Sequence, residues 1–73
     1  MAYTYKLFVD ADEKFSGTFP DAARLAYDAV FRATTFGQHE ATAGELADDI
    51  DRGFTSIDLR AAAPAITVQV VQS

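Results

Sequence analysis

The residues that could carry chemistry are few in this chain of 73 residues, and their spacing completes no metal or catalytic motif. His39 is the only histidine, and His39-Glu40 begins like the zinc-protease motif H-E-x-x-H. The second histidine would stand at position 43, which is Ala43. There is also no cysteine that could bind zinc as a thiolate. We therefore predict no zinc site and expect His39 to lie in an exposed loop.

Other partial motifs fail in the same way. Asp10-x-Asp12 begins like a calcium-binding loop, but Lys14 replaces the third ligand and Phe15 replaces the required glycine. The serines stand in no nucleophile elbow, and the four glycines form no phosphate-binding loop. A small domain also has little room for the pocket of ~300 Å³ or more that a small-molecule site usually needs. The sequence predicts no catalytic residue, no metal and no cofactor, and a protein that is not an enzyme.

The most distinctive chemical feature is an acidic segment in a chain of net charge −5. Between Arg32 and Arg52 there is no lysine or arginine, and the acids near this stretch are Glu40, Glu45, Asp48, Asp49 and Asp51. Glu45 and Asp49 repel each other across one helical turn, and Asp51 stands near a predicted helix C-terminus, where the dipole disfavours an acid. Helix formation therefore does not require these acids. Two interpretations stay open: a solvated face that serves solubility, or a docking surface for a basic groove.

Four apolar or aromatic residues are candidates for a second contact surface: Phe8, Tyr27, Phe31 and Val71. Phe8 and Val71 fall on the strand faces opposite the predicted core, where they could help to form an apolar patch. Tyr27 and Phe31 flank the polar stripe of a predicted helix, so we expect them at the edge of the core. Such a surface would contact a foreign partner or a second copy in a homodimer, although single exposed apolar residues commonly have no function.

Alternation of apolar and polar residues predicts the strands that position these side chains. Residues 3–9 alternate, with Tyr5, Leu7 and Val9 on the inward face. A polar turn at 10–13 and a second strand at 14–19 follow. After the helical region, residues 54–60 and 66–71 alternate again, and the turn at 61–64 separates them.

A change to helical spacing predicts two helices between these strand pairs. Thr18 is the predicted N-cap of the first, which runs to about Thr35. Thr42 and Glu45 predict a capping box for the second, and Gly53 its stop. The predicted fold is α+β, one domain of residues 1–73 in the order β-β-α-α-β-β. One four-stranded, mostly antiparallel sheet carries both helices on one face. The predicted shared core comprises Leu25, Ala29, Leu46, Ile50, Ile57, Leu59, Val68 and Val70.

Two short segments resemble known domains. Gly17-Thr18-Phe19, with Ala22, Ala26 and Tyr27, is similar to the hairpin-to-helix junction of bacterial immunoglobulin-binding domains of the protein L type. Thr4-Tyr5-Lys6-Leu7 is similar to the first strand of the protein G type. The resemblance covers less than a quarter of the chain, and the second helix departs from both patterns. It implies a hairpin-helix-hairpin layout alone, because a fold does not fix a function.

These patterns together predict a small acidic protein that works by binding another protein. The N-terminus MAYTYKLFVD has no signal-peptide pattern and no cysteine is present, so we expect a cytoplasmic protein without a membrane partner. The acidity argues against direct binding to nucleic acid. The sharper hypothesis is an inhibitor that mimics nucleic acid on a basic surface of its target, by analogy with small acidic phage and mobile-element proteins such as anti-CRISPR inhibitors. The alternative is a homodimeric structural or regulatory module whose acidity serves only solubility.

Overall fold

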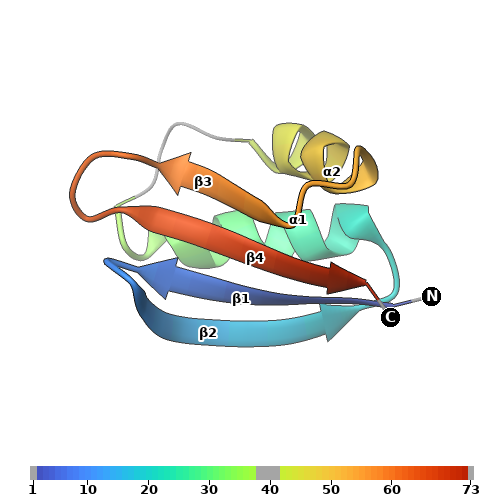
Figure 1. The fold of residues 1–73 in the computed structure, drawn as a ribbon, viewed down its shortest axis with the longest axis horizontal. Coiled ribbons are helices and arrows are strands. Elements are labelled where there is room, and N and C mark those ends of the chain that lie inside the picture. The colour runs from blue at the N-terminus through green and yellow to red at the C-terminus, as the bar shows by residue number, and fades with distance from the viewer. Residues whose placement is uncertain (1, 38–41, 73) are drawn as a thin grey trace.

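The computed structural model describes residues 2–37 and 42–72 and has the predicted order of elements. The strands are β1 (Tyr3–Val9), β2 (Asp12–Phe19), β3 (Ser56–Arg60) and β4 (Ile66–Gln72), and the helices are α1 (Ala22–Thr34) and α2 (Ala43–Asp51). The strands form one sheet in the order β2-β1-β4-β3. Both helices lie on one face of it (Figure 1). The α+β prediction is confirmed, and all three strand pairings are antiparallel.

The turn between β1 and β2 is shorter than the sequence predicts. Asp10 and Ala11 alone connect the strands, with φ angles of 50° and 70°. Two successive positive φ values match the twist of an antiparallel hairpin, so β2 can begin at Asp12. Leu7 pairs with Phe15, whereas Phe8 pairs with Glu13. One extra residue in β2 therefore forms a bulge at this end of the hairpin.

Helix α1 begins later than predicted, because Thr18 is part of the sheet. Thr18 pairs with Thr4 in β1, and their hydroxyl oxygens lie 2.9 Å apart. The N-cap is Asp21, whose carboxylate accepts a hydrogen bond from the Arg24 backbone N–H at 2.8 Å. The prediction of Thr18 as the cap was wrong by three residues.

The ends of α2 agree with the sequence prediction. The Thr42 hydroxyl accepts a hydrogen bond from the Glu45 backbone N–H at 3.2 Å. Gly53 follows the helix with φ of 95°, a left-handed conformation that glycine adopts without strain. The backbone N–H of Gly53 closes the last turn on the Ile50 carbonyl at 3.0 Å.

The core fills the space between the sheet and the two helices. The largest fully buried side chains are Tyr5, Leu7, Leu25, Leu46, Ile66 and Val68. Four buried alanines of α1 let this helix pack closely: Ala22, Ala26, Ala29 and Ala33. Of the residues predicted to share the core, only Ile57 is half-buried, because β3 is an edge strand.

Candidate functional site

The acidic residues of α2 divide into exposed and partly covered groups. Glu45, Asp48 and Asp51 are exposed. Asp49 is partly covered, and its carboxylate lies 3.9 Å from the Arg52 guanidinium. Glu40 lies outside the described residues. The acids that face solvent on α2 are thus three of the four predicted there, and we call Glu45, Asp48 and Asp51 the acidic face.

The aromatic residues of α1 are far more exposed than an edge-of-core position implies. Tyr27 has 72% of its surface exposed and Phe31 has 61%. They stand four residues apart, so they share one face of the helix. This face points away from the sheet, because the buried alanines occupy the opposite side of α1. The sequence correctly separated Tyr27 and Phe31 from the centre of the core, but it underestimated their exposure.

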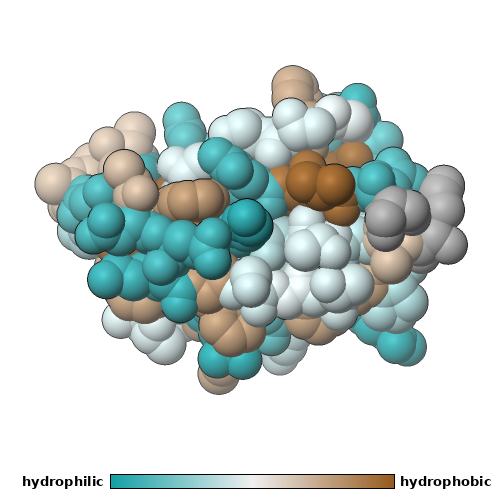
Figure 2. Space-filling view, turned by 60° about the horizontal axis from the view of Figure 1, so that its bottom comes forward, coloured by the Kyte–Doolittle hydropathy of each residue, from teal (hydrophilic) through white to brown (hydrophobic). Residues whose placement is uncertain are grey.

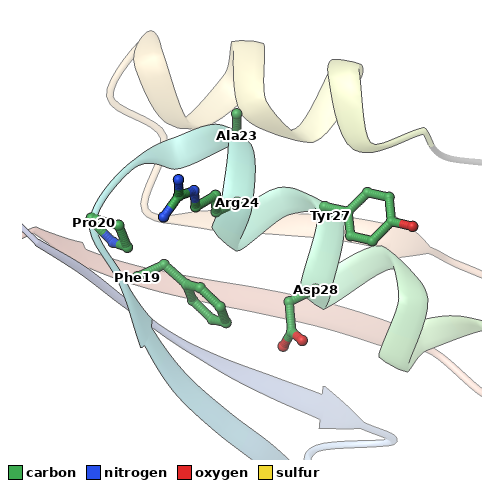
Figure 3. A pocket seen from close by; sticks show the side chains of 6 residues that line it. All are labelled: Phe19, Pro20, Ala23, Arg24, Tyr27 and Asp28. Atoms are coloured by element: carbon green, nitrogen blue, oxygen red, sulfur yellow. The ribbon is translucent and has the colours of Figure 1, made fainter.

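A hollow lies beside Tyr27 at the N-terminal half of α1 (Figure 3). Its volume is about 520 Å³, larger than we expected of so small a domain. The residues that line it are Phe19, Pro20, Ala23, Arg24, Tyr27 and Asp28. Figure 3 shows Tyr27 projecting from the helix, while the side chains of Phe19 and Asp28 lie on the side of the strands. The walls are therefore mainly apolar, with one base and one acid on the rim.

The acid on this rim is already held by two neighbours. The Tyr5 hydroxyl donates a hydrogen bond of 2.5 Å to the Asp28 carboxylate. The Arg32 guanidinium lies 3.7 Å from the same carboxylate and 3.8 Å from the centre of the Phe15 ring. Burial, and then the hydrogen bond to Asp28, raise the pKa of the Tyr5 phenol well above its ordinary value. Asp28 thus accepts a structural hydrogen bond that joins α1 to the buried Tyr5 of β1.

The two candidates on the open face of the sheet do not lie together. Phe8 is half-buried and pairs with Thr67, whereas Val71 is exposed and pairs with Thr4. Lys6 and its neighbour Gln69 stand between these pairs. A view turned to bring the bottom of Figure 1 forward shows brown apolar areas separated by teal and white ones (Figure 2). The strand register, with Lys6 and Gln69 between them, makes Phe8 and Val71 two separate apolar positions.

Sequence reasoning missed two side chains that join distant elements. Tyr5 was placed in the core, but its hydrogen bond with Asp28 spans 23 residues of sequence. Arg60 donates hydrogen bonds to the Gly37 carbonyl at 2.8 Å and to the Ala63 carbonyl at 3.3 Å. The signal for Tyr5 was available, because a buried tyrosine hydroxyl normally needs a partner. The spacing of residues did not identify Asp28 as the partner of Tyr5, nor the carbonyls of Gly37 and Ala63 as the partners of Arg60.

The described residues offer no centre for metal chemistry, and no relative supplies one. Within residues 2–37 and 42–72, no three His, Cys, Asp or Glu side chains are grouped so that they could hold a metal ion. His39 lies outside these ranges. None of the helices described here is long and apolar enough to cross a membrane. No family model matches the chain, and neither a curated protein nor a solved structure matches it.

Proposed function

We propose that this protein is a non-enzymatic binding module that docks on a basic surface of another protein. The observation that carries the proposal is the acidic face of α2, where Glu45, Asp48 and Asp51 all face solvent. Arg52, the C-cap of this helix, is the one base within the segment, and it pairs with Asp49 instead. The acidic face therefore keeps its negative charge uncompensated by a local ion pair among the described residues.

The position of these acids supports a role in association. Leu46 and Ile50 anchor α2 in the core, so the acids are fixed on a folded element. A rigid cluster of one sign raises the rate at which an oppositely charged partner docks in the correct orientation. The chain's charge of −5 adds long-range attraction toward the same partner. A contact of this kind needs no cavity and no cofactor.

The kind of partner follows from the same chemistry. A protein surface that binds nucleic acid is rich in lysine and arginine, because it must neutralise phosphates. An acidic helix that occupies such a surface excludes nucleic acid from it. The proposed activity is therefore inhibition of a nucleic-acid-binding protein, in the manner of small acidic anti-defence proteins of phages, within the cytoplasm.

The experiment compares the acidic face with an equal loss of charge elsewhere. One variant carries Glu45→Gln, Asp48→Asn and Asp51→Asn. The matched control carries Asp12→Asn, Glu13→Gln and Asp58→Asn at exposed positions on the sheet. Both variants have a net charge of −2 in place of −5. Affinity capture from host extracts with the wild type and both variants identifies proteins that depend on the acidic face.

The captured candidate is then produced in pure form for rate measurements. We expect the acidic-face variant to associate roughly tenfold more slowly at low salt, and the difference to shrink as salt rises. The control should keep a rate close to that of the wild type. In a nucleic-acid competition assay, the wild type and the control should each displace nucleic acid from the captured candidate. The acidic-face variant should not. Equal association rates for all three proteins at low salt would exclude the acidic face as the docking surface.

A further inference from the structure

The outer face of α1 has the features of a contact surface that is separate from α2. Tyr27 and Phe31 are 72% and 61% exposed, and an apolar hollow of about 520 Å³ lies beside Tyr27. Residues 2–37 and 42–72 supply nothing that covers this face. We propose that it binds a second copy of the chain, with the two α1 helices packed antiparallel about a two-fold axis.

The order of charges along α1 selects the antiparallel arrangement. The charges alternate in sign over Asp21, Arg24, Asp28 and Arg32. If the axis passes level with residues 26 and 27, each Arg24 lies opposite Asp28 of the other copy. By the same symmetry each Asp21 lies opposite Arg32, so every facing pair has opposite signs. A parallel pair of helices would instead place each charge opposite its own equivalent, which is repulsive.

The charged side chains are available for such contacts. The side chain of Arg24 is 72% exposed and that of Asp21 is 52% exposed. Their present separation of 3.5 Å within one chain is a surface ion pair, which contributes little to stability. Arg32 is also 44% exposed while it lies beside Asp28. The Asp28 side chain is only 25% exposed, and the Tyr5 hydroxyl and the Arg32 guanidinium both contact its Oδ2. The other carboxylate oxygen of Asp28 and the three more exposed side chains can therefore form the polar rim of an interface while the hydrogen bond between Tyr5 and Asp28 stays in place.

The same symmetry brings an apolar side chain to the hollow. Phe31 lies about five residues from the proposed axis, which corresponds to ~7 Å at the rise of an α-helix. The two-fold axis moves it to the level of residues 21 and 22 in the other copy. That level falls between Pro20 and Ala23, which both line the hollow. Each Phe31 then fills the hollow of its partner, and the two Tyr27 rings meet near the axis.

The acidic face of α2 sets the tilt of this contact. If the helical layers of the two copies stacked directly, α2 of one copy would approach α2 of the other. Glu45, Asp48 and Asp51 would then repel the same residues of the partner copy. Asp28 and Arg32 lie on the flank of α1 toward β2, where they contact Tyr5 and Phe15. Helix α2 lies on the other flank of α1 (Figure 1). Contact tilted toward β2 therefore separates the two acidic faces and leaves both free.

The size of the molecule is compatible with this interface. A specific interface buries about 800 Å² on each partner. That is roughly a fifth of the 4325 Å² surface of one chain. An aromatic centre surrounded by a charged rim is also the usual composition of such a contact. The proposal thus needs α1, the hollow and the adjoining part of β2 to be covered in the dimer.

Sedimentation equilibrium of the full chain from micromolar to millimolar concentration tests the proposal. The wild type should show a reversible monomer–dimer equilibrium. Phe31→Glu should raise its dissociation constant about 30-fold or more, because it places a charge in the apolar hollow. Arg24→Glu should weaken the dimer too, since two new Glu–Asp contacts form. Circular dichroism checks that both variants keep the fold, which is expected because both side chains are exposed.

Matched controls place equivalent changes outside the proposed interface. Val71→Glu introduces a charge at an apolar position on the open sheet face that is 66% exposed. Lys6→Glu reverses a charge on the open sheet face, where the Lys6 side chain is 54% exposed. Both should leave the dissociation constant unchanged. A wild type that is monomeric at millimolar concentration would overturn the proposal. So would a dimer that tolerates Phe31→Glu and dissociates with Val71→Glu.

Isotope-filtered NMR on a mixture of labelled and unlabelled chains tests the geometry directly. Intermolecular contacts are expected between Phe31 of one copy and Ala23 or Pro20 of the other. Contacts through Phe8 or Val71 alone would assign the dimer to the open sheet face and refute the antiparallel α1 pair. The variant with Glu45→Gln, Asp48→Asn and Asp51→Asn should still dimerise. Failure of this inference is therefore distinguishable from failure of the proposed docking by α2.

Discussion

Tyr5 shows how a single polar atom is accommodated in this small core. Its ring is fully buried between Phe15 and Phe19, with ring centres 5.9 and 6.0 Å away. Its hydroxyl reaches the Asp28 carboxylate at 2.5 Å. Tyr5→Phe keeps the ring and removes this hydrogen bond, so we expect a loss of ~1–2 kcal/mol in the free energy of unfolding. Urea denaturation at neutral pH measures it, and an unchanged midpoint would contradict the role of the bond.

The same residue predicts a loss of stability at high pH. The pKa of Tyr5 is raised in the folded state above its ordinary value of 10.0. Above pH 10.0 the unfolded chain releases this proton while the folded chain retains it, so stability falls by ~1.4 kcal/mol per pH unit until the folded pKa is reached. The Tyr5→Phe variant has no phenol at this position, so it lacks this pH-dependent loss of stability. Denaturation midpoints of both proteins between pH 9 and 11 should therefore converge as pH rises.

Ala11 is a strained residue at a solvent-exposed turn. Its φ of 70° lies in the left-handed region, which residues other than glycine, asparagine and aspartate seldom adopt. Ala11→Gly creates the Asp-Gly pair that two-residue hairpins favour. We expect it to stabilise the protein by ~1 kcal/mol, which corresponds to a melting temperature higher by about 4–8 °C. Thermal denaturation tests this, and a lower melting temperature would show that the turn carries no such strain.

At the scale of elements, helix α2 depends on two anchors. It has nine residues and cannot be stable alone, and its buried side chains are Leu46 and Ile50. Ile50→Ala should lower the free energy of unfolding by ~2–5 kcal/mol through the cavity it leaves. A domain of this size has a total of only ~4–11 kcal/mol, so the variant is close to unfolding. An unchanged denaturation midpoint would mean that α2 does not pack as described.

Gly44 provides the matched control on the same helix. It is exposed, and a Cβ added there would meet only the Thr42 hydroxyl at 3.9 Å, an ordinary contact distance. Gly44→Ala should therefore raise stability by ~0.5–1 kcal/mol, because alanine loses less backbone entropy in a helix. Opposite signs for Ile50→Ala and Gly44→Ala in one denaturation series would separate packing of α2 from its intrinsic helix propensity.

At the scale of the whole molecule, the proposed self-association predicts that stability depends on protein concentration. If only the folded chain dimerises, the melting temperature rises with protein concentration, because dimerisation stabilises the folded state. Above the dissociation constant we expect an increase of roughly 3–5 °C per tenfold in concentration. Phe31→Glu should abolish this dependence, whereas Val71→Glu should retain it. Calorimetry over two decades of concentration provides the measurement, and a dependence that is equal in both variants would contradict the α1 interface.

The sequence by itself determined which face of β1, β3 and β4 is buried and where α2 begins and ends. Tyr5, Leu7 and Val9 face inward as the period of two requires, since successive side chains of a strand point to opposite sides. Thr42 caps α2 and Gly53 terminates it, because these signals act within a few residues. Helical spacing also predicted the exposure of Glu45 and Asp48, whereas Asp49, expected on the same outward face, is partly covered.

Only the tertiary structure decided the features that depend on contacts between distant residues. The strand order β2-β1-β4-β3 and the pairing of Thr18 with Thr4 depend on which strands lie next to each other in the sheet. The pairing of Tyr5 with Asp28 joins residues from β1 and α1. Tyr27 and Phe31 stay exposed because α2 packs on a different flank of α1 and covers neither of them. Helical spacing places two aromatic side chains on one face, but the packing of neighbouring elements decides whether that face is covered.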